Sequence, residues 1–147
     1  MVPLLDLPHA FYMSRCRDLA RQARASGDAA VGAVVVQAGS IIAEGVESVL
    51  ATFDVSAHAE VVALRRAGRT LATTRLRDCV LYTSVAPCVM CAYAIRLAAL
   101  GGMVTPAPDP ASEDARRGWL VLTSPRVLRR RSPPVVVRYV HEDAGLP

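Results

Sequence analysis

Short runs of aliphatic and β-branched residues alternate along this 147-residue chain with segments of helical periodicity. Residues 31–37 and 40–46 are separated by the Ala38-Gly39 turn, which predicts a hairpin of two strands. Further strands are predicted at 78–84, 100–105 and 135–140, and helices at 11–25, 57–67, 88–99 and 111–122. Because strands that alternate with helices form a sheet covered on both faces, we expect an α/β fold, a three-layer α/β/α domain with a central five-stranded mixed sheet.

The boundaries of the elements are predicted from glycines and prolines. Gly68 is expected to end the helix at 57–67, and Pro87 stands just before the helix at 88–99. Residues 47–56 are predicted to be an irregular loop, and residues 141–147 a loose tail.

Length and composition fit a single domain that spans residues 1–147. Hydrophobic residues make up 52% of the chain and charged residues 20%, which is typical of a compact globular protein. The N-terminus lacks the basic flank and long apolar run of a secretory signal, so we expect a cytoplasmic protein. The apolar stretch 86–104 is not predicted to span a membrane, because it contains Pro87, Arg96 and two glycines.

Of the four cysteines, Cys88 and Cys91 have an informative spacing. Residues three apart on a helix share a face, and the start of a helix favours the thiolate, so both sulfurs can bind one metal ion. Cys16 and Cys79 fall within a predicted helix and a predicted strand, where a free thiol acts as a small hydrophobic side chain.

A second polar group, His58-Ala59-Glu60, stands at the beginning of the helix at 57–67. Adding the His58 imidazole to two thiolates gives three protein ligands and leaves the fourth tetrahedral position of Zn²⁺ open for water, as in catalytic zinc sites. Bound zinc lowers the pKa of water to about 7, and Glu60 is placed to carry the proton. We therefore predict Zn²⁺ as the cofactor and hydrolysis at an amidine-like ring carbon with loss of ammonia.

The two motifs, HAE followed by PCVMC, resemble the signature of the cytidine deaminase-like superfamily of zinc deaminases, H-x-E followed by P-C-x-x-C. The similarity extends over residues 10–105 through AVGAVVV, DVSAHAEVVALR and PCVMCAYAIR, and it thins beyond Pro106. Within that superfamily the chain resembles guanine deaminases and tRNA adenosine deaminases more than the short cytidine deaminases, because a full helix separates its last two predicted strands. The resemblance implies a cytidine deaminase-like fold, a parallel pairing of those two strands and a homodimer.

The chain departs from the family pattern at two positions. Ala86 stands where relatives carry the Glu of E-P-C, and that acid is not the proton carrier. Glu47 stands where relatives commonly carry an Asn that hydrogen-bonds the substrate. An ionised Glu only accepts hydrogen bonds, so we hypothesise a substrate with adjacent donors, such as an amino-and-imino ring edge or a ribose diol. A solvated loop position is the alternative for Glu47.

Ala59 and Phe53 are the other residues expected to bind the substrate. Phe53 precedes the HAE motif and is placed to stack on a planar ring, with simple packing as the alternative. Met90 and Tyr93 are expected to pack in the core or in a dimer interface. His141 in the tail is a surface residue by default, with completion of a neighbouring pocket as the alternative.

The leading hypothesis is a hydrolytic deaminase of a nucleobase, nucleoside or related amino-heterocycle, with no membrane partner. A tRNA-specific adenosine deaminase is the nearest alternative: the net charge of +4 and the run Arg129–Arg131 favour an RNA partner, whereas Glu47 and the scatter of the other arginines do not. A catalytically silent zinc-binding module is the second alternative. Glu60 argues against it, because a structural zinc site needs no acid beside an open coordination position.

Overall fold

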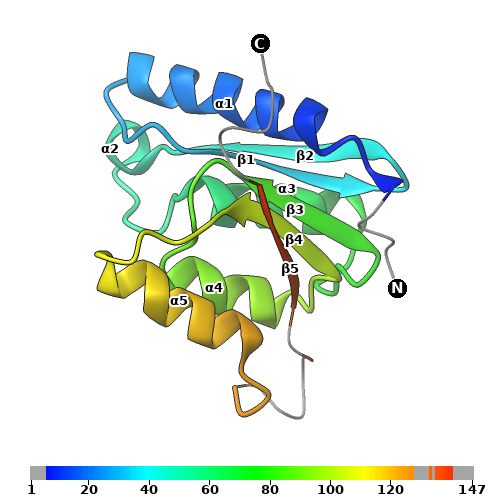
Figure 1. Cartoon of the computed structure of the whole chain (residues 1–147). Coiled ribbons are helices and arrows are strands. Elements are labelled where there is room, and N and C mark those ends of the chain that lie inside the picture. Colours follow the sequence, from blue (N-terminus) through cyan, green and yellow to red (C-terminus); the bar gives the residue numbers. More distant parts are fainter. Residues whose placement is uncertain (1–5, 128–132, 134, 141–147) are drawn as a thin grey trace.

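The computed structural model of the chain has a central sheet with helices on both faces (Figure 1). The structure describes residues 6–127, 133 and 135–140. The run Arg129–Arg131, His141 and the predicted tail at 141–147 lie outside the described residues. In chain order, the described elements are α1 (His9–Ala25), β1 (Gly32–Gln37), β2 (Ser40–Val46), α2 (Val49–Thr52), α3 (Ala59–Thr70), β3 (Cys79–Thr83), α4 (Val89–Leu97), β4 (Gly102–Pro106), α5 (Glu113–Thr123) and β5 (Val136–Val140).

The strands form one sheet in the order β2-β1-β3-β4-β5 across the described residues. Strand β1 is antiparallel to both β2 and β3, and the turn into β2 has positive φ at Ala38 and Gly39, as a tight hairpin requires. Strands β3, β4 and β5 run parallel because α4 and α5 provide the crossovers between them. The predicted mixed sheet and the parallel pairing of the last two strands are confirmed.

The two faces of the sheet carry separate apolar cores, because successive strand residues point to opposite faces. Helix α1 covers one face, where its residues Tyr12, Met13, Cys16 and Leu19 pack with Val34, Val36, Val80, Tyr82 and Val104. Helices α3, α4 and α5 contribute to the core on the other face, together with Val35, Leu81 and Met103. Figure 1 shows α1 on the opposite side of the sheet from α4 and α5. The predicted three-layer α/β/α arrangement is confirmed, and Cys16 and Cys79 are fully buried as expected.

Two boundary predictions were wrong. Gly68 does not end its helix, since α3 continues to Thr70 and the chain turns at Ala72, where φ is +51°. A glycine inside a helix is tolerated when packing stabilises the segment, and the buried residues of α3 provide that packing. The loop predicted at 47–56 contains the one-turn helix α2, in which the N–H groups of Leu50 and Ala51 donate to the buried carboxylate of Asp28.

The Arg96 side chain joins α4 to the end of α5. It is fully buried, and its Nη1 donates to the carbonyl oxygens of Val121, Leu122 and Ser124 at 2.9–3.0 Å. These bonds satisfy a charge that would otherwise be costly to bury, and they hold the C-terminal end of α5 against α4. Among the residues that the structure describes, none of the helices has the length and apolarity to cross a bilayer.

Candidate metal centre

His58 occupies the N-cap position of α3. Its backbone is extended, with φ −67° and ψ 147°, and within the described chain its side chain makes no capping hydrogen bond. Strand β2 lies close to this helix start, since a Cβ on Gly45 would meet the Ala59 carbonyl oxygen at 1.9 Å. The glycine therefore lets β2 approach the first turn of α3 and fixes the position of His58 relative to the sheet.

Cys88 occupies the N-cap position of α4, directly after Pro87. Its backbone is also extended, and its Sγ accepts a hydrogen bond from the Cys91 N–H at 3.4 Å. Helix α5 approaches this helix start closely, because a Cβ on Gly118 would meet the Pro87 carbonyl oxygen at 2.3 Å. The three-residue spacing brings both sulfurs to the same side of α4, as the sequence predicts.

The imidazole of His58 faces both sulfurs. Its Nδ1 lies 3.7 Å from Cys88 Sγ and 3.5 Å from Cys91 Sγ. Zinc–sulfur bonds of about 2.3 Å and zinc–nitrogen bonds of about 2.0–2.1 Å at a tetrahedral angle separate the two atoms by about 3.6 Å. The three side chains thus form a potential metal site whose sulfur-to-nitrogen distances fit tetrahedral zinc.

Each of the two cysteines changes the pKa of the other. The Cys91 thiol donates to the Cys88 sulfur and lowers the pKa of Cys88 to about 5, while this bond and burial raise the pKa of Cys91. Two thiolates this close repel each other, so the second proton leaves readily only when a cation offsets the negative charge. The pair is therefore suited to bind a divalent metal.

Glu60 lies beside the ligands with its carboxylate enclosed by protein. It is 2% exposed, its Oε1 accepts a hydrogen bond from Thr83 Oγ1 at 3.1 Å, and its Oε2 lies 3.6 Å from Cys91 Sγ. Burial raises the pKa of Glu60 above its ordinary value. A carboxyl group in this environment holds a proton more readily than an exposed glutamate does, which suits it to proton transfer.

Glu47 is also buried, with 7% of its surface exposed, so the alternative of a solvated loop position is wrong. Its Oε2 accepts the Ala59 N–H at 2.9 Å, and its Oε1 lies 4.0 Å from His58 Nε2. Burial raises the pKa of Glu47, since the charged form loses its hydration. Glu47, His58 and Glu60 together form a second group of potential ligands.

The structure places the other two predicted substrate-binding residues differently from each other. Ala59 is completely buried at the first position of α3, between His58 and Glu60. Phe53 is 98% exposed and has φ of 55° in the turn after α2. Packing of Phe53 in the core is therefore wrong, and its stacking on a substrate ring stays a prediction.

Sequence reasoning missed two residues near the centre. Thr83 is a buried polar residue at the end of β3, and its hydroxyl donates to Glu60. Asp114, in the first turn of α5, accepts the Val89 N–H at 3.3 Å and so faces the start of α4. Thr83 could have been found from the sequence, because it is a polar residue at the end of an apolar strand. Asp114 could not, because its role depends on a contact between two helices that no local sequence pattern predicts.

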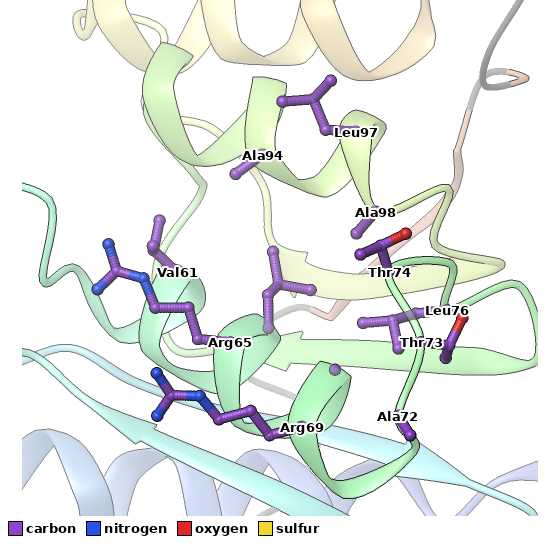
Figure 2. Close-up of a pocket in the computed structure, with 12 residues that line it drawn as sticks. Val61, Arg65, Arg69, Ala72, Thr73, Thr74, Leu76, Ala94, Leu97 and Ala98 are labelled. Atoms are coloured by element: carbon purple, nitrogen blue, oxygen red, sulfur yellow. The ribbon is translucent and has the colours of Figure 1, made fainter.

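A groove of about 850 Å³ lies between α3 and α4. Figure 2 shows Val61, Arg65 and Arg69 of α3 on one side of it, and Ala94 and Leu97 of α4 on the other. Its described lining does not include the metal ligands. Met90 and Tyr93, on the same helix as Leu97, are 38% and 43% exposed, so their packing in the core is wrong.

Comparison with known proteins identifies this arrangement. The family model of the cytidine and deoxycytidylate deaminase zinc-binding region matches residues 8–106, which include both ligand-bearing helix starts. The chain belongs to this deaminase family. The expected resemblance is confirmed, and zinc is the metal for which the family region is named.

Two curated relatives of the chain differ in substrate. The chain is 53% identical to a guanine deaminase of Bacillus subtilis (strain 168) over 64 residues, which cover 44% of this chain and 41% of that protein. It is 39% identical to a tRNA-specific adenosine deaminase of Aquifex aeolicus (strain VF5) over 90 residues, which cover 61% of this chain and 60% of that protein. The matched part thus spans about half the length of these relatives.

The fold is also similar to that of a solved tRNA:A34 deaminase, which carries out A-to-I editing at the wobble position of transfer RNA. The TM-score is 0.73 and the sequences are 31% identical, with 87% of this chain and 97% of that chain covered. The predicted cytidine deaminase-like fold is therefore confirmed.

Proposed function

We propose that this protein is a zinc-dependent hydrolytic deaminase, which removes the exocyclic amine of a nucleobase, nucleoside or related amino-heterocycle and releases ammonia. The observation that carries the proposal is the set of distances from His58 Nδ1 to the two cysteine sulfurs, with the buried Glu60 carboxyl group next to Cys91. A structural zinc site needs a fourth protein ligand and no buried acid, so this arrangement favours catalysis over a silent zinc-binding module.

In the proposed mechanism His58, Cys88 and Cys91 hold the metal. When bound, zinc lowers the pKa of a water molecule and so supplies a nucleophile at neutral pH. Glu60 accepts a proton from the attacking water and delivers protons to the ring nitrogen and to the departing amine. Thr83 holds Oε1 of Glu60, which leaves Oε2 to move the protons, and the buried setting keeps the carboxyl group able to hold one between steps.

The relatives support two substrate classes. One relative is a guanine deaminase and another acts on adenosine in tRNA, so a free purine and an RNA base are the candidates. We favour the small heterocycle because the arginines outside the run Arg129–Arg131 are scattered along the sequence rather than gathered in a basic stripe. Deamination of tRNA adenosine is the second candidate, supported by the fold similarity that covers 97% of the tRNA:A34 deaminase.

Three further features stay predictions: a single domain over residues 1–147, a cytoplasmic location and a homodimer. The exposed apolar residues of α4, Met90, Tyr93 and Leu97, supply a surface of the kind that a second subunit covers.

The test of the proposed function is ammonia release by the purified chain over guanine, guanosine, adenosine, cytosine, cytidine and aminotriazines, with zinc measured in the same sample. We expect about one zinc per chain and turnover of at least one compound. RNA binding at increasing salt separates the second candidate, because phosphate contacts weaken steeply with ionic strength. Bound zinc without ammonia release from any compound or from a tRNA anticodon stem-loop would support the silent module instead.

A further inference from the structure

We propose that Glu47 is a positioning residue, which holds the His58 imidazole in the orientation and tautomer that a metal ligand requires. This inference rests on the proposed zinc deaminase function. The starting observation is that the two ring nitrogens of His58 face different partners. Nδ1 faces the two sulfurs at 3.5 and 3.7 Å, whereas Nε2 faces the Glu47 carboxylate, with Oε1 4.0 Å away.

A neutral histidine carries one ring proton, and only the nitrogen without it can bind a metal. For Nδ1 to bind the metal, the proton must sit on Nε2. A carboxylate facing Nε2 favours this tautomer and increases the basicity of the ligating nitrogen, as partners of ligand histidines do in other zinc sites. At 4.0 Å the interaction is an electrostatic contact with the N–H group rather than a short hydrogen bond.

The Glu47 carboxylate is itself held in place. Its Oε2 accepts the Ala59 N–H at 2.9 Å, and its own backbone N–H donates to the Val31 carbonyl oxygen at 3.1 Å. Its side chain is 8% exposed. Each carboxylate oxygen thus faces a protein group on α3 or its N-cap, and little of the side chain is open to a substrate.

The difference between Glu and Asn at this position follows from the same contacts. An amide has one oxygen, so if it accepts the Ala59 N–H its NH₂ group faces the protonated Nε2 of His58, and two donors then meet. A carboxylate accepts from both groups at once. Glu47 can therefore accept from the Ala59 N–H and from His58 Nε2–H at the same time, which an amide side chain cannot do.

The experiment measures zinc release from the zinc-loaded chain to a chromophoric chelator. We expect Glu47→Ala to release zinc about tenfold faster than the wild type or more, which is the range for loss of such partners. Glu47→Gln, which has the same shape, should lie between the two. The matched control is Glu44→Ala, which removes a carboxylate from the neighbouring strand β2 whose partner is Arg15 rather than His58, and which should stay within about twofold of the wild type.

A second readout separates positioning from substrate binding and from a purely structural role. Ammonia release normalised to bound zinc should show a lower kcat with KM nearly unchanged in Glu47→Gln. A raised KM with wild-type zinc release would overturn the inference in favour of substrate contact. A lower Tm of the metal-free variants with wild-type zinc release would overturn it in favour of helix capping alone.

Failure of the proposed function gives a different pattern. If the wild type binds zinc and releases it slowly but deaminates no compound, the deaminase proposal fails while the effect of Glu47 on zinc release still holds. If the wild type deaminates and the two Glu47 variants release zinc as it does, only the role of Glu47 is overturned. Both fail if the wild type binds no zinc.

Discussion

The beginnings of α3 and α4 supply the three candidate zinc ligands, yet the N–H groups of their first turns are capped by different kinds of group. At α4, Cys88 Sγ accepts the Cys91 N–H and still faces the His58 nitrogen. At α3, the His58 side chain makes no capping bond within the described chain, and Glu47 of the neighbouring loop accepts the first N–H instead. A sulfur has several lone pairs and can cap and bind a metal together, whereas each imidazole nitrogen offers one site.

The two helix starts also differ in how deeply the carboxylate that caps each of them is buried. Glu47 is 7% exposed and faces His58, but Asp114 is exposed and accepts the Val89 N–H at a longer 3.3 Å. Glycine produces the close approach in both cases, Gly45 of β2 against α3 and Gly118 of α5 against α4. The comparison indicates that the start of α3 depends on its neighbours for ligand geometry, whereas the start of α4 is nearly self-sufficient.

The largest effect is expected from removing a ligand or the proton carrier. Replacing His58 or Cys88 with Ala should abolish stoichiometric zinc and lower ammonia release by more than about 100-fold, since loss of a ligand exceeds the effect of losing its partners. Glu60→Gln should lower ammonia release by about 10²–10⁴-fold and retain zinc, because it removes only the proton transfer. Zinc analysis and an ammonia assay on the same samples check both. Turnover by Glu60→Gln at the wild-type rate would contradict the mechanism.

The next effect is expected from the two glycines at the helix starts. Gly45→Ala and Gly118→Ala should each destabilise the protein by about 1–3 kcal/mol or more, because the added Cβ meets backbone that cannot move without shifting a helix. Chemical denaturation of the metal-free chain measures this. Gly68→Ala is the control, since its Cβ would lie 3.0 Å from the Thr73 carbonyl oxygen and helix propensity offsets the crowding. If the start of α3 depends on its neighbours more than the start of α4 does, Gly45→Ala should release zinc faster than Gly118→Ala. The reverse order would contradict this difference between the two helix starts.

A smaller effect is expected from the exposed cap of α4. Asp114→Ala should lower the free energy of unfolding by about 0.5–1 kcal/mol, through loss of a carboxylate at a helix N-terminus. Chemical denaturation of the metal-free Asp114→Ala variant and of the wild type measures this value. A loss above about 2 kcal/mol would mean that the start of α4 is not self-sufficient.

The smallest effect concerns the attachment of β2 to α1 through Arg15 and Glu44. The Arg15 guanidinium makes two hydrogen bonds to Glu44 at 2.7 and 2.8 Å and lowers the pKa of that carboxyl group. Both side chains are about one-third exposed, so Arg15→Met should cost roughly 0.5 kcal/mol at pH 7 after allowance for solvent screening.

The pH dependence of that cost has a defined sign. Because folding lowers the pKa of Glu44, the stabilisation is fully present above the ordinary value of 4.5 and is lost as the pH falls through the lower folded-state value. Denaturation curves of wild type and Arg15→Met should therefore converge below that pH. A difference that persists in acid would assign the effect to packing of the Arg15 stem instead.

The sequence by itself determined the order of the main elements, the two apolar faces and the identity of the candidate ligands. Periodicity predicts the elements and their apolar faces, and the HAE and PCVMC motifs predict the candidate ligands, because each of these signals depends on residues only two to four positions apart. The Cys88 and Cys91 pair is of this kind, and the HAE motif places His58 and Glu60 at one helix start. The end of α3 was misjudged at Gly68, since a local signal for helix termination was outweighed by packing of the buried helix face.

Only the tertiary structure decided how the ligands meet and what surrounds them. Glu47 has a role only because β2 lies against α3, and Asp114 and Thr83 reach the centre from elements that no local pattern pairs with it. The burial of Glu60 and the contact between Glu47 and His58 arise from residues brought together over long sequence separations. Such contacts depend on the packing of whole layers, and so the chemistry could be inferred from the motifs while its positioning could not.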